Sequence, residues 1–186
     1  GDNVYVSSVV GNFDDVQSAM KTIFSDEEIR AKASENGCIF SSANSINWGR
    51  AVPQIAYYVS GYFDLLKSGA ISEDDEINVC VPTGNFGNIL AAFYAKEMGI
   101  PIKKFICASN SNNVLTDFFR TGKYDKNREF HVTNSPAMDI LISSNLERLI
   151  FNLSGNDDKV MRKYMSKLQS DGAYTVSSEI FEKISN

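Results

Sequence analysis

The feature that most constrains the fold is a glycine-bearing loop between a predicted strand and a predicted helix. Four segments follow one another as strand, loop, helix and strand, at residues 77–81, 82–88, 89–98 and 105–108. The first is short, rich in β-branched residues and bounded by polar ones, which is typical of a buried strand. Gly99 and Pro101 follow the helix and are typical helix stop signals. Strands separated by one short helix indicate a parallel pair with a right-handed connection.

The loop itself predicts an anion-binding site. Gly84 and Gly87 allow the backbone to approach a ligand closely, and the following helix start offers unpaired N–H groups and a positive dipole end. Such a helix start binds phosphate. In the alternative interpretation the glycines only relieve strain in a tight connection, and the spacing alone does not decide between the two. The loop is neither a Walker A loop nor a GxGxxG dinucleotide motif.

A second candidate anion site lies at residues 44–50, where small polar residues run into a helix. A simple helix cap explains most of this segment, but Arg50 fits that interpretation poorly. A cation in a first helical turn opposes the helix dipole by up to about 1 kcal/mol. Arg50 is either an exposed side chain that tolerates this penalty or, with Asn44 and Ser45, a ligand of one anion.

The rest of the chain alternates predicted strands and helices. Further strands are predicted at residues 4–10, 38–40 and 131–132. Longer helices are predicted from Asn12 onward, over residues 52–66 and 136–153, and on towards the C-terminus. This alternation predicts an α/β fold with a mostly parallel sheet and flanking helices, as a single unit over residues 1–186.

Composition narrows the partners. The chain has 186 residues, of which 43% are hydrophobic and 22% charged, with a net charge of −5. The negative charge argues against nucleic acid and against an anionic membrane surface as partners. No apolar run is long enough to span a membrane. The three cysteines show no metal or redox spacing and favour a reducing, cytoplasmic location.

Neither a metal site nor an acid–base catalyst is predicted. The acidic runs at residues 26–28 and 73–76 lack metal-ligand spacing and are interpreted as solvated. His131 is the single histidine, and no serine or cysteine nucleophile motif accompanies it. Trp48 is interpreted as a packing residue. The chain begins at Gly1 without methionine, which favours an excised fragment.

Three motifs in order resemble threonine synthase, a pyridoxal-phosphate enzyme of the tryptophan-synthase-β-like fold (fold type II). They lie at residues 11–15, 42–47 and 81–88, and the similarity extends from Tyr5 through Ala137 and more loosely beyond. The resemblance implies that the loop wraps the cofactor phosphate, through Gly84, Asn85, Phe86, Gly87 and Asn88. It also implies that Asn44, Ser45 and Arg50 hold the phosphate of the substrate.

The reaction implied by the resemblance converts O-phosphohomoserine and water into threonine and phosphate, with pyridoxal phosphate as electron sink. The resemblance is also compatible with a homodimer. The family's Schiff-base lysine lies in a Phe-Lys-Asp context that this chain lacks, so no catalytic residue is assigned here and the fragment alone is expected to be inactive. Two alternatives stay open: another lyase of the same fold, such as a threonine dehydratase, and a non-catalytic phosphometabolite-binding module.

Overall fold

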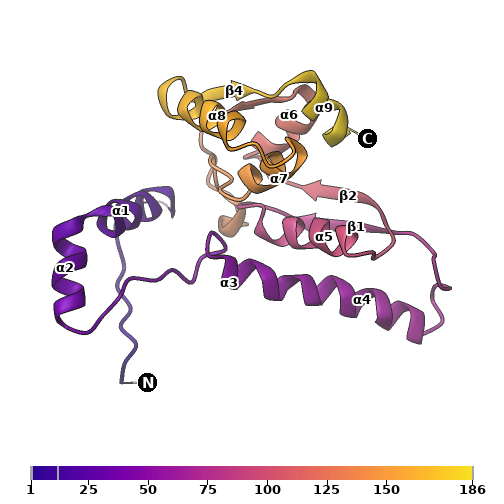
Figure 1. The fold of residues 1–186 in the computed structure, drawn as a ribbon, viewed down its shortest axis with the longest axis horizontal. Coiled ribbons are helices and arrows are strands. Elements are labelled where there is room, and N and C mark those ends of the chain that lie inside the picture. Colours follow the sequence, from indigo (N-terminus) through magenta and orange to yellow (C-terminus); the bar gives the residue numbers. More distant parts are fainter. Residues whose placement is uncertain (1, 12, 186) are drawn as a thin grey trace. The chain divides into compact units, whose positions relative to one another are not determined.

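The computed structural model describes residues 2–11 and 13–185 (Figure 1). These residues fall into two compact units, Gly1–Ser42 and Ala43–Asn186. The second unit holds the strands and most of the helices, so the α/β character lies there. The prediction that residues 1–186 form one unit stays a prediction.

The first unit is a pair of helices, α1 (Phe13–Ser25) and α2 (Glu27–Glu35). Asp26 is the N-cap of α2, and its carboxylate accepts a hydrogen bond of 3.0 Å from the Ile29 N–H, as a capping residue should. The Phe24 and Phe40 rings stack with their centroids 5.2 Å apart. The helix cap predicted at Asn12 lies outside the described residues.

The strands predicted at residues 4–10 and 38–40 are wrong. Both segments are irregular, and the valines of the first are largely exposed, with Val6 91% and Val10 105% accessible. A strand needs a neighbour to accept its backbone hydrogen bonds and cover its apolar face. The alternating pattern is present at residues 4–10, but no described strand pairs with it.

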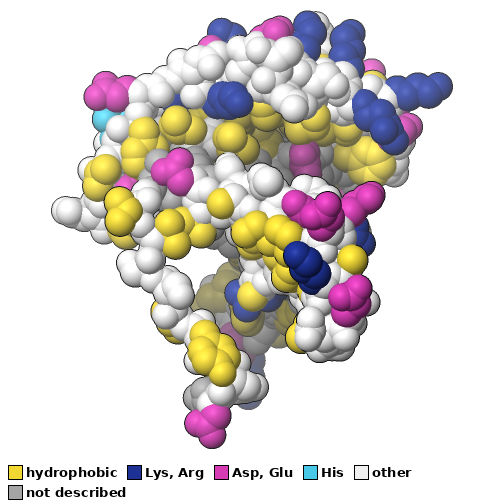
Figure 2. Space-filling model, turned by 90° about the vertical axis from the view of Figure 1, so that its left-hand side faces the viewer, with side chains coloured by type: hydrophobic (Ala, Val, Ile, Leu, Met, Phe, Trp, Pro, Cys, Tyr) yellow, Lys and Arg dark blue, Asp and Glu magenta, His cyan; other side chains and the backbone are white. Residues whose placement is uncertain are grey.

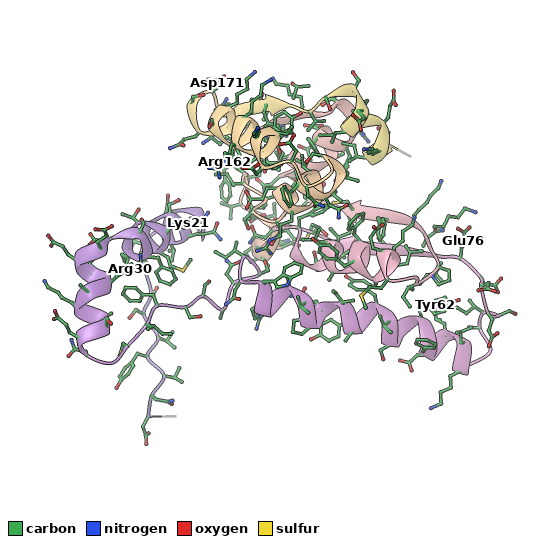
Figure 3. All side chains as sticks on the ribbon, viewed as in Figure 1. Lys21, Arg30, Tyr62, Glu76, Arg162 and Asp171 are labelled. Atoms are coloured by element: carbon green, nitrogen blue, oxygen red, sulfur yellow. The ribbon has the colours of Figure 1, made fainter. Side chains whose placement is uncertain are left out.

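The second unit opens with three successive helical segments, α3 (Trp48–Ala51), the 3₁₀ turn η1 (Val52–Gln54) and α4 (Ile55–Lys67). A single helix was predicted over residues 52–66. Pro53 lacks an N–H and its ring crowds the preceding turn, which explains the local tightening to 3₁₀ geometry. Tyr62, labelled in Figure 3, is 5% exposed on α4, which packs against α5 (Gly87–Glu97).

The predicted strand, loop, helix and strand are present as β1 (Ile77–Pro82), the loop, α5 and β2 (Ile102–Ala108). The two strands are parallel, with Val79 opposite Phe105 and Val81 opposite Cys107. The α/β fold is confirmed, but its mostly parallel sheet is not. The four described strands form one parallel pair, β1–β2, and one antiparallel pair, β3 (Lys123–Asp125) with β4 (Ala173–Thr175).

Four further helices pack around the antiparallel pair: α6 (Val114–Thr121), α7 (Leu146–Leu153), α8 (Asp158–Ser170) and α9 (Ser178–Ser185). The core between them is aromatic. The Tyr174 ring stacks on Tyr124 at 5.5 Å and on Tyr164 at 5.3 Å, and Phe118 meets both Tyr124 and Tyr174 edge-on. These four rings are at most 7% exposed, so they form the centre of this part of the core.

The helix predicted over residues 136–153 is wrong in its first half. Only a 3₁₀ turn, η2 (Pro136–Met138), forms there, and the α-helix begins at Leu146. The intervening backbone bonds elsewhere: the Tyr124 hydroxyl donates to the Leu141 carbonyl at 3.0 Å and accepts from the Ser143 N–H at 2.7 Å. These tertiary bonds replace the helical ones. The predicted strand at residues 131–132 is likewise irregular.

Several large hydrophobic side chains reach the surface of the described residues, among them Tyr57 and Phe63 on α4 and Ile106 on β2. Figure 2 shows hydrophobic side chains interspersed with both signs of charge on the face it draws. Within residues 2–11 and 13–185, no helix combines the length and the apolar character that crossing a membrane requires.

Candidate anion site

The glycine loop, residues 84–88, connects the end of β1 to the start of α5. Before it, the Thr83 N–H donates to the Ala108 carbonyl at 3.0 Å, which extends the strand pairing to the loop. Within it, Phe86 adopts a left-handed conformation with φ 64° while its side chain is buried, 3% exposed. A non-glycine residue with positive φ is uncommon, and such backbone strain concentrates at functional sites.

The N–H groups of this loop are not consumed by the protein. Within the described part of the chain, the amides of Gly84, Asn85, Phe86, Gly87 and Asn88 donate to no protein atom. The first amide that is used is that of Ile89, which donates to Asn88 Oδ1 at 2.9 Å. Five successive free donors at a helix start form the arrangement that binds anions.

Neither glycine has room for a side chain. A Cβ at Gly84 would lie 2.9 Å from the Ala137 carbonyl oxygen, and a Cβ at Gly87 would lie 2.7 Å from Ser45 Cβ. Both distances are shorter than a real Cβ contact, so the close approach of backbone requires glycine at these positions. Phe86, not a glycine, takes the left-handed conformation.

The contact at Gly87 brings the two predicted anion-binding segments together, although they are about forty positions apart in the sequence. Ser45 belongs to the upstream turn, residues 44–47, in which the Asn47 N–H donates to the Asn44 carbonyl at 2.9 Å. Asn145 joins this turn to the glycine loop, since its Nδ2 donates to Ser45 Oγ at 3.0 Å and to the Asn85 carbonyl at 2.9 Å. The sequence therefore predicted two segments that the fold places side by side.

Arg148 binds the backbone carbonyls of the upstream turn. Its guanidinium donates to the Ser45 carbonyl at 3.1 Å and to the Ile46 carbonyl, and it lies over the Trp48 ring, 5.4 Å from the centroid. The Tyr94 ring meets Trp48 edge-on at 5.4 Å. Trp48 packs between these two side chains, although 48% of it is exposed.

The predicted substrate residues differ in their surroundings. Ser45 and Asn44 are half-buried, and Ser45 Oγ is 3.4 Å from Asn44 Oδ1. Arg50 is exposed on α3, which packs against α5, and its guanidinium has no hydrogen-bond or ion-pair partner among residues 2–11 and 13–185. The structure therefore places Ser45 at the glycine loop and leaves Arg50 one helical turn away as an unpaired cation.

A buried carboxylate lies behind the glycine loop. Asp139, 5% exposed, accepts hydrogen bonds from the Thr133 N–H and hydroxyl at 2.8 and 2.7 Å, from Asn110 at 2.6 Å and from Asn112 at 3.0 Å. Burial alone would raise the pKa of Asp139, but these hydrogen bonds outweigh it and the pKa lies below its ordinary value. We call these four residues the Asp139 cage.

Other reactive groups near the loop are inert or remote. Burial raises the pKa of the Cys107 thiol to about 11, against a smaller lowering by Thr83, so this thiol stays protonated at neutral pH. His131 is exposed. Among the described residues, no lysine hydrogen-bonds to the glycine loop and no group of three or more His, Cys, Asp or Glu side chains is placed to hold a metal ion.

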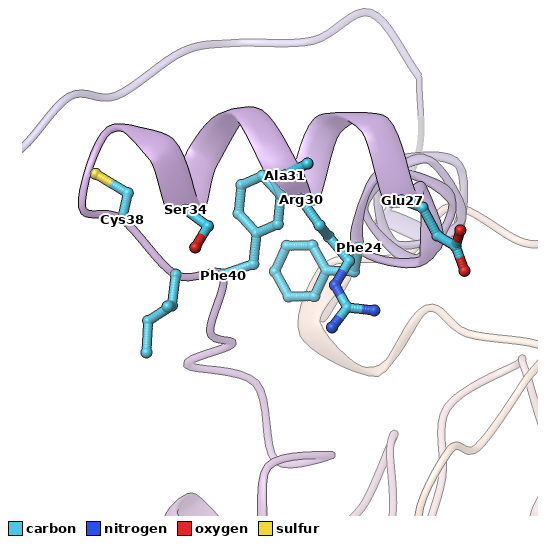
Figure 4. A pocket seen from close by; sticks show the side chains of 8 residues that line it. Phe24, Glu27, Arg30, Ala31, Ser34, Cys38 and Phe40 are labelled. Atoms are coloured by element: carbon cyan, nitrogen blue, oxygen red, sulfur yellow. The ribbon is translucent and has the colours of Figure 1, made fainter.

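A separate hollow lies in the first unit, with a volume of about 610 Å³ (Figure 4). Its lining mixes two aromatic rings with polar and charged groups: Phe24, Glu27, Arg30, Ala31, Ser34, Cys38, Ile39 and Phe40. The sequence contained no motif for it. It shares no residue with the glycine loop.

Sequence reasoning missed the residues that hold the loop. Ser143 donates from its hydroxyl to the Gly84 carbonyl at 2.8 Å, and Asn145 and Arg148 form the bonds described above. One signal was available: Ser143, Ser144 and Asn145 interrupt the apolar stripe of the predicted helix with three polar residues in a row.

The chain was compared with known proteins. No protein-family model matches it. It is 49% identical over 185 residues to threonine synthase-like 1 of Homo sapiens, covering 98% of this chain and 25% of that protein. It is 38% identical over 200 residues to threonine synthase of Schizosaccharomyces pombe, covering 97% of this chain and 37% of that protein.

Solved structures give the same relationship. The crystal structure of threonine synthase from Brucella melitensis with pyridoxal phosphate bound matches with a TM-score of 0.83 and 40% identity, over 98% of this chain and 37% of that one. The chain thus spans between a quarter and about two fifths of the length of these relatives.

Proposed function

Since the chain belongs to the threonine synthase family, we propose that it is the phosphate-binding part of a longer pyridoxal-phosphate-dependent carbon–oxygen lyase. The proposed reaction converts O-phosphohomoserine and water into threonine and phosphate. The observation that carries the proposal is the row of free amides at residues 84–88, placed directly beside Ser45.

The residues present fit the phosphate group of the cofactor. The loop amides supply neutral donors at the positive end of α5, and the absent Cβ atoms at Gly84 and Gly87 leave the backbone itself as the binding surface. Asn85 Oδ1 is buried with no partner in the described structure, so this side chain retains an acceptor for a donor group of a ligand. When bound, pyridoxal phosphate supplies an electron-withdrawing ring.

The substrate phosphate is proposed to bind at the upstream turn. Ser45 offers a hydroxyl, Asn44 a carboxamide, and Arg50 an unpaired guanidinium whose planar fork suits phosphate oxygens. In this proposal, the loop amides hold the phosphate of the permanently bound cofactor. The Arg50 cation attracts the phosphate of the substrate, which binds and leaves in each turnover. No group in the chain is assigned to proton transfer.

A second candidate rests on one finding: the chain is more identical to threonine synthase-like 1, at 49%, than to the threonine synthase of Schizosaccharomyces pombe, at 38%. In this candidate the protein binds pyridoxal phosphate and a phosphorylated metabolite but does not form threonine. A cytoplasmic location and a homodimer stay predictions in both cases.

One experiment separates the candidates. The longer protein is incubated with pyridoxal phosphate and O-phosphohomoserine, and threonine, released phosphate and bound cofactor are measured together. Threonine and phosphate in equal amounts support the first candidate, and bound cofactor without threonine supports the second. Absence of cofactor binding contradicts both. Arg162→Ala serves as the control, because Arg162 (Figure 3) is exposed on α8 and its ion pair among the described residues is with Asp158 of the same helix.

A further inference from the structure

Two carbonyl groups of the glycine loop are held by the segment just before α7, residues 143–145. The Ser143 hydroxyl donates to the Gly84 carbonyl at 2.8 Å. Asn145 donates twice to the Asn85 carbonyl, from its backbone N–H at 3.1 Å and from Nδ2 at 2.9 Å. The loop is therefore anchored by its acceptors while its donors stay free.

Because the peptide group is planar, anchoring the loop carbonyls also sets the direction of the loop N–H groups. In a trans peptide the C=O of one residue and the N–H of the next point to opposite sides of the chain. No described peptide bond is cis. Because the Gly84 and Asn85 carbonyls point at residues 143–145, the N–H groups of Asn85 and Phe86 point away from them. These are two of the five amides that have no protein acceptor.

The Asn145 side chain does not cap the helix that it precedes. It occupies the N-cap position of α7, where an asparagine side chain commonly accepts a bond from a backbone N–H of its own helix, yet it forms no such bond. Its Oδ1 instead accepts from Arg148 at 2.7 Å, and the residue is 0% exposed. The bonds of its Nδ2 group lie with other parts of the fold, at Ser45 and Asn85.

The same carboxamide reaches the second predicted anion site. Asn145 Nδ2 lies 3.0 Å from Ser45 Oγ and 2.9 Å from the Asn85 carbonyl, so one buried group spans both segments. Ser143 is fixed in turn, since its N–H donates to the Tyr124 hydroxyl in the aromatic core at 2.7 Å. The direction of the loop amides is thus tied to the packing of the second unit.

We propose that Ser143 and Asn145 are positioning residues that aim the Asn85 and Phe86 amides at the phosphate group of the bound ligand. The inference rests on the proposed function, in which residues 84–88 receive the cofactor phosphate. Neither side chain touches the ligand; each acts by holding a carbonyl.

The test compares two ligands that differ only in the phosphate, pyridoxal phosphate and pyridoxal. Dissociation constants of both are measured on the longer protein for wild type, Asn145→Ala and Ser143→Ala. Losing one anchoring bond should raise the dissociation constant of pyridoxal phosphate about tenfold, which is equivalent to roughly one to two hydrogen bonds. Pyridoxal should bind with unchanged affinity. Tyr164→Phe is the matched control, because it removes a bond to the Ser177 N–H far along the chain from the loop.

The outcomes separate this inference from the proposed function. If wild type binds the two ligands equally, the glycine loop does not bind the cofactor phosphate and the proposed function is contradicted. If wild type prefers pyridoxal phosphate and both variants keep the full preference, the positioning role is overturned, while the proposal that the glycine loop binds phosphate is supported. If a variant weakens both ligands equally, its role is general support of the fold and the inference is likewise overturned. Ser143→Ala removes a single hydroxyl, so it keeps the test open where Asn145→Ala fails to fold.

Discussion

The glycine loop and the Asp139 cage contain the same kinds of group, backbone amides and asparagine side chains, but use them in opposite ways. In the cage four donors converge on the buried carboxylate of Asp139. In the loop five amides donate to nothing in the described protein. Buried polar groups are normally satisfied, so the cage carboxylate is satisfied within the protein, while the loop amides keep donors for the proposed ligand.

The two regions are also adjacent, since the carbonyl of Ala137, two residues before Asp139, lies against Gly84. The cage fixes the turn at residues 136–139, and that turn closes one side of the loop. A hydrogen-bonded carboxylate and the proposed anion site therefore lie next to each other. The two clusters have similar composition, and they differ in whether their hydrogen-bond donors are used within the described protein.

The largest effect is expected from filling the loop. Gly84→Val places a Cβ 2.9 Å from a backbone oxygen, which cannot move away as a side chain end could. We expect binding of pyridoxal phosphate to be lost, with a destabilisation of about 1–3 kcal/mol from overpacking. Titration with the cofactor and thermal unfolding of the longer protein measure the two effects.

The matched control is Gly61→Ala, because Gly61 lies in the middle of α4 with nothing within 4 Å of its added Cβ. This variant should bind cofactor normally and gain about 0.5–1 kcal/mol of stability from helix propensity. Normal cofactor affinity in Gly84→Val would remove the loop from the phosphate site.

A smaller effect, on stability but not on ligand contacts, is expected from the cage. The folded pKa of Asp139 is lowered, so its contribution to stability is present above the ordinary carboxyl pKa and is lost as the pH falls through the folded pKa. Unfolding midpoints of wild type should therefore drop in acid below the ordinary carboxyl pKa. Asp139→Asn removes this contribution and presents an amide donor to the surrounding donors.

Measured from neutral to acid pH, Asp139→Asn should start lower than wild type and fall less steeply. Parallel curves for the two proteins would show that the Asp139 carboxylate does not titrate with folding. The ratio of pyridoxal phosphate to pyridoxal affinity should change less in Asp139→Asn than in Gly84→Val, since the cage donates nothing to the ligand.

The smallest change in the protein is expected from Arg50→Ala. The Arg50 side chain is exposed and has no partner in the described structure, so stability should stay within about 0.5 kcal/mol of wild type. The affinity for the phosphorylated substrate should fall about tenfold or more, as for loss of a charged hydrogen bond. Cofactor affinity should not change. An unaltered substrate affinity would remove Arg50 from the site.

The sequence predicted the features that are encoded locally. The loop and helix at residues 82–98 are marked by their own glycines and apolar run. The same local logic failed at residues 136–145, where the apolar spacing fits a helix. The actual partners there are 17 to 60 positions away, at Tyr124 and Asn85, and no local pattern reports them.

The site followed the same division. Glycines and small polar residues marked both proposed anion-binding segments, but no motif in the sequence marked Asn145, which joins them, or Arg148, which holds the upstream turn. The strand predicted at residues 4–10 shows the converse case. Its alternating pattern is correct for a strand, and pairing depends on a neighbour that the pattern does not contain.

The most direct measurement is a crystal structure of the longer protein with pyridoxal phosphate. The account predicts phosphate oxygens within about 2.7–3.2 Å of the Asn85 and Phe86 nitrogens, with Ser143 and Asn145 still bonded to the carbonyls behind them. A cofactor phosphate bound elsewhere, or those two nitrogens bonded to protein acceptors in its presence, would contradict it.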